Sequence, residues 1–413
     1  MLKNNSEYDV LIIGAGLVGT LISLQLSKLG LKCCLIEKNS MSQIDETDIF
    51  SPLSLNYRSR IILGKFGLWD DINEKAFPIK TLILKSFNSL SNLKFTAKEL
   101  SIDSLGCVVD RKFLLNVFRK HIKKDKNIKI FESVRIDNMK YNDSQYNIIL
   151  SATNSDSVKS SIITKHIISS DGAESEIKKR FKFRSEIIDY DQTSYIYNCH
   201  AKANDNEAVQ IFNKYGIFAI IPYGVGRVNL VLTIKNKYLG KFFTKANEVN
   251  NVYISSLFKK YIYNLSNLKM VSKYNMITSR TEEILKNNIL LLGNSSQLLH
   301  PVGAQGFNLA LRNIETIVDS LISNSNRTDL LANLCSVFSV NSNVITQIKT
   351  DRKKVFSYID SATRILGGDK VTNRFISLLA FNYTKTSSTA KKYFLKKLLG
   401  IENYKYLTIK GSP

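Results

Sequence analysis

The chain begins with a hydrophobic run, residues 8–13, that leads directly into the segment GAGLVG at residues 14–19. A short run of β-branched and apolar residues that stops at a glycine is typical of a buried parallel strand. Apolar residues then recur at helical spacing over residues 17–29, and a second apolar run, residues 32–36, ends at Glu37. The pattern therefore predicts a strand, a helix and a second strand, which together form the βαβ unit of a parallel sheet.

Turn residues divide the middle of the chain into short apolar segments. The alternation predicts strands over residues 81–98 (an antiparallel pair), 128–131, 146–151 and 161–169, with a helix over 111–123. A second strand-rich region follows residue 185 and contains a predicted hairpin, residues 216–222 with 227–234.

The last third of the chain returns to the strand and helix pattern. Residues 289–292 form a short apolar run, and a glycine-punctuated loop follows it. The next helix shares one apolar face among Ala310, Ile314, Ile317, Val318 and Leu321. Residues from 329 to about 401 read as helical.

The spacing Gly14-x-Gly16-x-x-Gly19, placed between strand and helix, is a dinucleotide-binding pattern. The first glycine makes the turn, the second lets the backbone approach a pyrophosphate, and the third allows close helix packing. Glu37 ends the next strand, where a carboxylate accepts hydrogen bonds from a ribose. The pattern favours a cofactor site over a purely structural turn, and by itself it does not choose between FAD and NAD.

Two later segments add to this site. Asp171 and Gly172 follow an apolar strand, a position where an Asp-Gly pair is usually only a turn. Gly303 and Gly306 precede the amphipathic helix, so a second helix N-terminus is available to hold partial negative charge. Two such helix starts in one chain suggest a single extended cofactor that reaches both.

Composition narrows the class of protein. The 413 residues are 44% hydrophobic and 23% charged, as expected for a globular enzyme rather than a disordered or fibrous chain. The net charge of +23 is spread along the chain, which favours a solvated surface over nucleic-acid binding. The five cysteines suggest neither a disulfide framework nor a metal site. We expect a cytoplasmic protein, because no apolar stretch is long enough to cross a bilayer and the first residues lack a signal-peptide layout.

These blocks resemble a known family. Residues 293–309, GNSSQLLHPVGAQGFNL, together with Leu53-Ser54, FGLW at 66–69 and VVDR at 108–111, are similar to the class A flavin-dependent aromatic hydroxylases. Within that class the chain looks most like the ubiquinone-biosynthesis hydroxylases, in particular the 2-polyprenyl-6-methoxyphenol hydroxylase branch. The resemblance spans nearly the whole chain.

The resemblance implies an α/β fold like that of 4-hydroxybenzoate hydroxylase. A Rossmann-type FAD-binding domain would comprise residues 1–75, 100–184 and 280–345. A mixed-sheet substrate domain, residues 76–99 and 185–279, would be interleaved with it, and residues 346–413 would form a helical C-terminus. Carried over position by position, the implied FAD-binding residues are Gly14, Gly16, Gly19, Glu37, Arg111, Asp171, Gly172, Gly293, Asn294, Gly303, Gln305, Gly306 and Asn308.

Candidates for the chemistry are fewer. His300 is a candidate for proton transfer, although a lone histidine beside a proline is more often structural, and Pro301 would place a backbone carbonyl at the substrate. Phe218, Ile220 and Pro222 are predicted to face the substrate from the hairpin, although the same alternation also describes an ordinary sheet core.

The function that the resemblance implies is hydroxylation of a polyprenylated phenol in ubiquinone biosynthesis. Reduced FAD would react with O2 to give a C4a-hydroperoxide, with NAD(P)H or another reductant as electron donor. The alternatives are an FAD-dependent reductase or oxidase of another lipid, or a non-catalytic paralogue in a quinone-synthesis complex.

A lipid substrate would require contact with the inner face of a membrane, with a lipid-carrier protein or with other ubiquinone-synthesis proteins. The basic amphipathic segment 391–399 is the candidate surface. Packing of its apolar face on the protein itself is the favoured alternative.

Overall fold

A computed structural model of the chain describes residues 6–41, 49–86, 92–142, 144–153, 158–244, 249–322, 327–366 and 382–402. Parts of two predicted segments lie outside these residues: 87–91 of the predicted antiparallel pair, and 367–381 and 403–413 of the predicted helical C-terminus.

The first large sheet carries the predicted βαβ unit. Its main path runs β17-β18-β11-β1-β2-β8, and β1, β2, β8, β11 and β18 are parallel neighbours along it. An antiparallel ribbon, β9 and β10, extends from β11. The strands are β1 (Ser6–Ile13), β2 (Cys33–Ile36), β8 (Ile128–Phe131), β9 (Val134–Asn142), β10 (Gln145–Ala152), β11 (Val158–Ser169), β17 (Leu285–Lys286) and β18 (Ile289–Leu291).

The second half of β1, residues 10–13, is apolar throughout because both faces of the sheet are covered there. Val10 and Ile12 pack in the cluster that includes α1 (Leu17–Lys28), α4 (Arg111–Ile122) and α8 (Gln305–Ile322). Leu11 and Ile13 pack on the other face with residues of the β9–β10 ribbon. A strand buried on both faces reads as a continuous hydrophobic run, so the sequence shows no alternation there.

The second large sheet runs β19-β16-β12-β15-β14-β13-β5-β6. The predicted hairpin is confirmed as β14 paired antiparallel with β15, and the predicted pair near residues 81–98 as β5 with β6. Its strands are β5 (Thr81–Ser86), β6 (Asn92–Thr96), β12 (Ser185–Ala203), β13 (Glu207–Asn213), β14 (Gly216–Gly224), β15 (Arg227–Lys235), β16 (Ile262–Thr281) and β19 (Gln297–Leu298).

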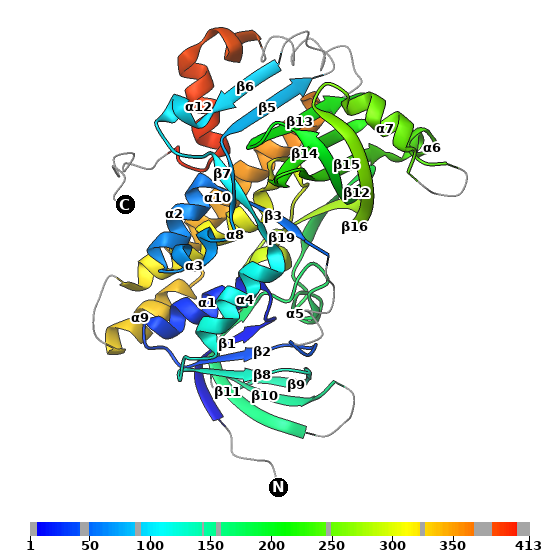
Figure 1. The fold of residues 1–413 in the computed structure, drawn as a ribbon. Coiled ribbons are helices and arrows are strands. Elements are labelled where there is room, and N and C mark those ends of the chain that lie inside the picture. The colour runs from blue at the N-terminus through cyan, green and yellow to red at the C-terminus, as the bar shows by residue number, and fades with distance from the viewer. Residues whose placement is uncertain are drawn as a thin grey trace.

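A small third sheet, β3-β7-β4, joins the two halves: β3 (Pro52–Asn56), β4 (Phe77–Ile79) and β7 (Gly106–Asp110). In Figure 1 the long helices α8 and α10 lie between the two large sheets. The remaining helices are α2 (Tyr57–Lys65), α3 (Trp69–Asn73), α5 (Glu176–Arg180), α6 (Leu239–Phe242), α7 (Asn251–Phe258), α9 (Arg327–Val337), α10 (Asn343–Ser361) and α12 (Ser388–Leu398), with short helical turns at 97–100, 236–238, 293–295, 302–304 and 362–366.

The predicted α/β class, with one sheet unit interleaved in the chain of the other, is confirmed. The first large sheet takes strands from residues 6–36, 128–169 and 285–291, and the second from 81–96, 185–281 and 297–298. The residue boundaries of the predicted domains stay a prediction. One strand of the second sheet, β19, falls inside the range predicted for the first domain.

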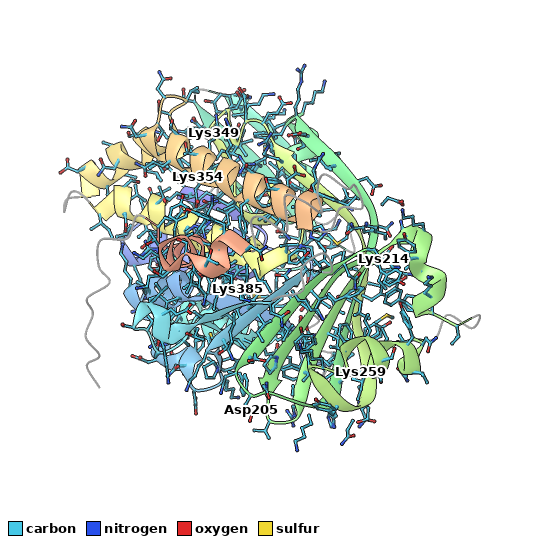
Figure 2. The ribbon with its side chains drawn as sticks, turned by 90° about the horizontal axis from the view of Figure 1, so that it is seen from above. Asp205, Lys214, Lys259, Lys349, Lys354 and Lys385 are labelled. Carbon is cyan, nitrogen blue, oxygen red and sulfur yellow. The ribbon has the colours of Figure 1, made fainter. Side chains whose placement is uncertain are left out.

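Helix α8 and the C-terminal helices follow the hydrophobic pattern. The predicted apolar face of α8, from Ala310 to Leu321, is buried. Ile345 and Ile348 of α10 join the same core cluster. Within the described part of the chain, none of the helices combines the length and the apolar character needed to span a membrane. Basic side chains lie on several sides of the molecule, with Lys349 and Lys354 far from Lys259 in Figure 2.

Candidate functional site

The glycine-rich loop between β1 and α1 is shaped by contacts that leave no room for side chains at two of its three glycines. Gly14 has a φ of +97°, and a Cβ there would lie 2.7 Å from the carbonyl oxygen of Ser170. A Cβ on Gly19 would lie 1.9 Å from the carbonyl oxygen of Gly14. Gly16 differs, because a Cβ there would meet no atom within 4 Å. The space in front of Gly16 is therefore open to a ligand.

The first turn of α1 has the features of an anion-binding site. Its N-cap residue is Gly16, no side chain caps it, and no acidic residue lies in the first turn. The free N–H groups and the helix dipole therefore present positive partial charge. Glu37, at the end of β2, lies beside this loop: its Oε2 accepts a hydrogen bond from the backbone N–H of Ala15 at 2.8 Å. This geometry fits a pyrophosphate at α1 and a ribose at the carboxylate.

The segment after β11 holds the glycine-rich loop in place. Ser170 Oγ donates to backbone carbonyls at the end of β1, including that of Gly14 at 3.0 Å. Asp171 accepts from Ser169 Oγ at 2.5 Å, so its carboxylate is engaged within its own turn. Gly172 has a φ of +89°, and a Cβ there would meet nothing within 4 Å. The structure thus brings Asp171 and Gly172 to the first loop, where Asp171 acts on the shape of the turn.

A third loop, after β18, completes the cluster. Gly293 has a φ of +64°, and a Cβ there would lie 3.0 Å from Cγ2 of Val18 on α1. Ser295 Oγ donates to the carbonyl of Ser169 at 2.6 Å. The side chain of Asn294 is exposed. Three loops therefore meet at the carboxyl ends of the neighbouring parallel strands β1, β11 and β18, the edge at which open α/β sheets bind ligands.

Arg111 is the first residue of α4, a helix that packs against α1. Its backbone N–H donates to the carbonyl of Ser51 at 2.8 Å, and Asp110 caps the helix by accepting from the N–H of Lys112. The side chain of Arg111 is exposed. The structure therefore places this cation at a fixed helix start, free to reach an anionic ligand.

His300 lies in a buried position at the start of the loop before α8. Its Nε2 is 3.3 Å from Oε1 of Gln192 on β12, and its ring packs edge-to-face on Tyr190. Burial lowers the pKa of His300 to about 4, so the imidazole is neutral near pH 7. Its Nδ1 is buried without a hydrogen-bond partner among the described residues. An imidazole with so low a pKa is a weak base near pH 7, so its packing on Gln192 and Tyr190 favours a role in shaping the loop that begins at Pro301.

The loop from Pro301 to α8 is a tight turn that turns its polar side chains away from solvent. Gly303 and Ala304 both have positive φ, +68° and +51°. Asn308 Oδ1 accepts from the backbone N–H of Asn56, and its Nδ2 donates to the carbonyl of Ala304 at 2.6 Å. Asn308 is thus a buried link to β3 and α2, and the backbone of the loop is what remains for a cofactor.

Gln305 and Gly306 are the first two residues of α8, and their surroundings differ. Gln305 Nε2 donates to the carbonyl of Leu398 at the end of α12, so this side chain links the loop to the C-terminal helix. A Cβ on Gly306 would meet nothing within 4 Å, so that position is open.

The predicted substrate residues lie on the hairpin strand β14. Phe218 and Ile220 are fully buried in the cluster formed with α6 and α7, where Phe218 packs against Phe242. Ile217 precedes Phe218 in the strand, so its side chain lies on the other face of the sheet, where it packs with Val302 of the loop before α8. A substrate-binding role for Phe218, Ile220 and Pro222 stays a prediction, and the geometry favours their neighbours in the strand.

The sheet face that carries Ile217 has a partly exposed apolar row that the sequence pattern does not indicate. Ile196, Val231 and Ala219 are register partners on adjacent strands of the same face, and all three are half-exposed although their strands are central. At one end of this row, Asn198 Nδ2 donates to the carbonyl of Phe50 at 2.7 Å. Only the strand register reveals this half-exposed apolar row, because its three residues come from three different strands.

The basic helix α12 packs on the protein. Leu395 and Leu399 are buried beside Phe95 of β6, and Phe394 stacks on that ring at 5.5 Å. Lys391 forms an ion pair with Glu99. The apolar face of this helix is therefore occupied, as the favoured alternative predicted.

The fold and the three loops define the class of protein: a flavoprotein with the class A monooxygenase fold. The chain belongs to the FAD binding domain family, whose model matches residues 7–331. It is therefore an FAD-dependent enzyme.

Among curated relatives, the ubiquinone hydroxylase UbiM of Neisseria meningitidis is 21% identical over 327 residues, which cover 77% of this chain and 69% of that protein. The digeranylgeranylglycerophospholipid reductase 3 of Methanosphaera stadtmanae is 23% identical over 335 residues, 75% of each chain. Among solved structures, the p-nitrophenol 4-monooxygenase PnpA of Pseudomonas putida superposes with a TM-score of 0.74 at 16% identity, covering 97% of this chain and 100% of that one.

Proposed function

We propose that this enzyme is a monooxygenase that hydroxylates the aromatic ring of a polyprenylated phenol, of the 2-polyprenyl-6-methoxyphenol type, in ubiquinone biosynthesis. The observation that carries the proposal is the half-exposed apolar row formed by Ile196, Ala219 and Val231, on the sheet face that also packs against Val302. The relationship to a ubiquinone hydroxylase supports the same substrate class.

The described residues offer a candidate contact for each part of FAD. The open space at Gly16 and the uncapped start of α1 would take the pyrophosphate, and Glu37 would take the adenosine ribose. Asn294 would bond the ribityl chain, and the backbone around Gly306 would border the isoalloxazine. When bound and reduced by NAD(P)H or another reductant, FAD would supply the oxygen-activating chemistry with O2.

The protein's part in the reaction is to position the ring and to exclude water. The side chains of Ile196, Ala219 and Val231 offer an apolar floor to a phenol ring. Asn198 fixes Phe50 at the edge of that floor, and Phe50 in turn stacks on Tyr223 at 4.3 Å. His300 is a weak general base, because burial lowers the pKa of its imidazole to about 4.

Access of a prenylated substrate is part of the same proposal. A prenyl chain partitions into lipid, so the substrate would come from the inner face of a membrane or from a lipid-carrier protein. The apolar face of α12 is already packed on the protein, so another surface would make this contact. We therefore propose a cytoplasmic enzyme with peripheral access to the membrane.

The test uses purified holoenzyme with a short-chain 2-prenyl-6-methoxyphenol, a pyridine nucleotide and air. We expect substrate-dependent oxygen consumption and a product that is heavier by one oxygen atom. Oxidation of the pyridine nucleotide without a hydroxylated product, with a range of prenylated phenols, would refute the proposal.

A second candidate is an FAD-dependent reductase or oxidase of another lipid, of which the reductase is favoured by the relationship to the digeranylgeranylglycerophospholipid reductase 3. Anaerobic incubation with reduced enzyme separates the two functions. A reductase forms a product heavier by two hydrogens without O2, whereas a monooxygenase forms none. A colourless, folded protein that does not take up FAD would support a non-catalytic paralogue instead.

A further inference from the structure

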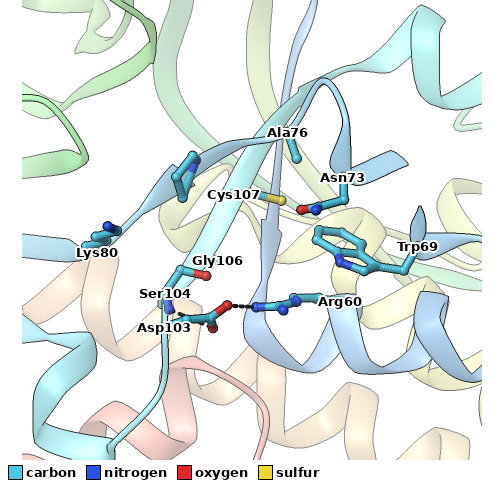
Figure 3. A pocket seen from close by; sticks show the side chains of 10 residues that line it. Arg60, Trp69, Asn73, Ala76, Lys80, Asp103, Ser104, Gly106 and Cys107 are labelled. Carbon is cyan, nitrogen blue, oxygen red and sulfur yellow. Dashed lines mark hydrogen bonds and ion pairs between the residues drawn. The ribbon is translucent and has the colours of Figure 1, made fainter. Parts of the chain in front are cut away.

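A pocket of about 290 Å³ lies outside the candidate flavin site, between the small sheet and the helices that follow β3 (Figure 3). One wall is the antiparallel pair β4 and β7, in which Pro78 is the register partner of Cys107. The opposite wall is Trp69 and Asn73 of α3, with Arg60 of α2 below them. The volume lies just under the range of about 300–1,000 Å³ typical of ligand sites, so it suits a ligand with one ring rather than a dinucleotide or a prenyl chain.

The pocket is separate from the site described above. None of the residues predicted to bind FAD or substrate lines it. Strand β7 connects the two sites: it begins at Gly106, which lines the pocket, and ends at Asp110, the residue before the predicted FAD-binding residue Arg111. At about 3.3 Å per residue, the two ends of this strand are about 13 Å apart. Cys107 is 6% exposed, and burial raises the pKa of its thiol to about 12. The thiol therefore stays protonated and serves as an apolar wall.

The charged groups of the pocket favour an anion. The guanidinium of Arg60 lies over the Trp69 ring, 5.3 Å from its centroid, and forms an ion pair with Asp103. Lys80, whose side chain is exposed, adds a second cation. Two cations and one carboxylate leave a net charge of about +1 around a space that Pro78 and other apolar groups line.

We propose that this pocket binds a small planar aromatic carboxylate. The ring would pack against the indole of Trp69, the one aromatic side chain among the residues that line the pocket. Asp103 accepts from Nη1 of Arg60, so the ligand's carboxylate would engage the remaining donors of the guanidinium, whose planar fork matches a carboxylate. The inference does not rest on the proposed function, because the pocket is built without any residue of the flavin site.

Trp69 also provides the measurement, because it is the only tryptophan of the chain. Benzoate is titrated into full-length holoenzyme at constant ionic strength, with tryptophan fluorescence reporting this pocket and flavin absorbance reporting the flavin site. We expect a saturable change in tryptophan fluorescence with little change in flavin absorbance. Cyclohexanecarboxylate and benzyl alcohol, which lack the planar ring or the charge, should each bind at least about tenfold more weakly.

Two variants identify the site. Arg60→Gln should weaken benzoate binding about tenfold, and Ala76→Leu should abolish it by filling the pocket. The matched control is Arg135→Gln, which breaks a similarly exposed Arg–Asp pair on β9, and it should leave benzoate binding unchanged. No saturable fluorescence change with benzoate, or equal affinity in Arg60→Gln and Arg135→Gln, would overturn the proposal.

Discussion

Replacing each of two glycines of the first loop by alanine should have opposite consequences. At Gly19 the new Cβ would lie 1.9 Å from the carbonyl oxygen of Gly14, about 1.1 Å inside the 3.0 Å below which Cβ contacts essentially never occur. The neighbour is backbone and cannot rotate away. We therefore expect Gly19→Ala to lower the free energy of unfolding by about 3 kcal/mol, the upper end of the usual cost of overpacking.

At Gly16 the new Cβ would meet no protein atom within 4 Å, and φ is −74°, a value that alanine readily adopts. The stability of the apoprotein should change by at most about 1 kcal/mol. The methyl group would, however, occupy the space in front of the α1 amides. Losing two hydrogen bonds to a phosphate, about 1.5–3 kcal/mol each, should weaken FAD binding at least about a hundredfold.

The assay pairs urea unfolding of the two apoproteins, followed by circular dichroism, with FAD titration followed by flavin fluorescence. Gly16→Ala should unfold like the wild type and fail to hold FAD, whereas Gly19→Ala should unfold at lower urea. Wild-type FAD affinity in a folded Gly16→Ala variant would refute the placement of the pyrophosphate at α1. A Gly19→Ala variant as stable as the wild type would refute the close approach of Gly19 to the carbonyl of Gly14.

Three further outcomes are expected. Burial lowers the pKa of His300 to about 4 from an ordinary 6.5, so the unfolded chain binds the extra proton between these values. The free energy of unfolding should therefore be highest above pH 6.5 and fall by about 3 kcal/mol as the pH drops to 4. In the His300→Gln variant this fall should be smaller, as measured by urea unfolding at several pH values. Ala219→Leu should raise the KM for the phenol at least about tenfold without changing FAD binding, whereas Phe218→Leu should lower stability by about 1 kcal/mol and leave KM unchanged. Leu395→Ala should lower the thermal unfolding temperature, with a cost of about 2–5 kcal/mol, because α12 packs on the protein.

Local patterns were sufficient for a large part of the fold. The glycine spacing at residues 14–19 and the apolar runs on either side of it predict β1, α1 and β2, because each element depends on neighbours within a few positions. The apolar face of α8 and the β14–β15 hairpin follow from the same short-range rules. The long strands β12 and β16 are not evident in the sequence, because polar and apolar residues mix along them as they pass from one environment to another.

The sequence alone predicted a dinucleotide site at the first loop, and the glycines that carry this prediction lie where backbone approaches backbone closely, at Gly14 and Gly19. Only the tertiary structure decided which face of β14 looks toward the loop before α8. Residues 217–221 are apolar without exception, because one face packs on α6 and α7 and the other is the apolar side of the candidate substrate site, so no alternation distinguishes the two faces. The tertiary structure also decided the role of Asn308, whose partner Asn56 lies 252 positions away in the chain.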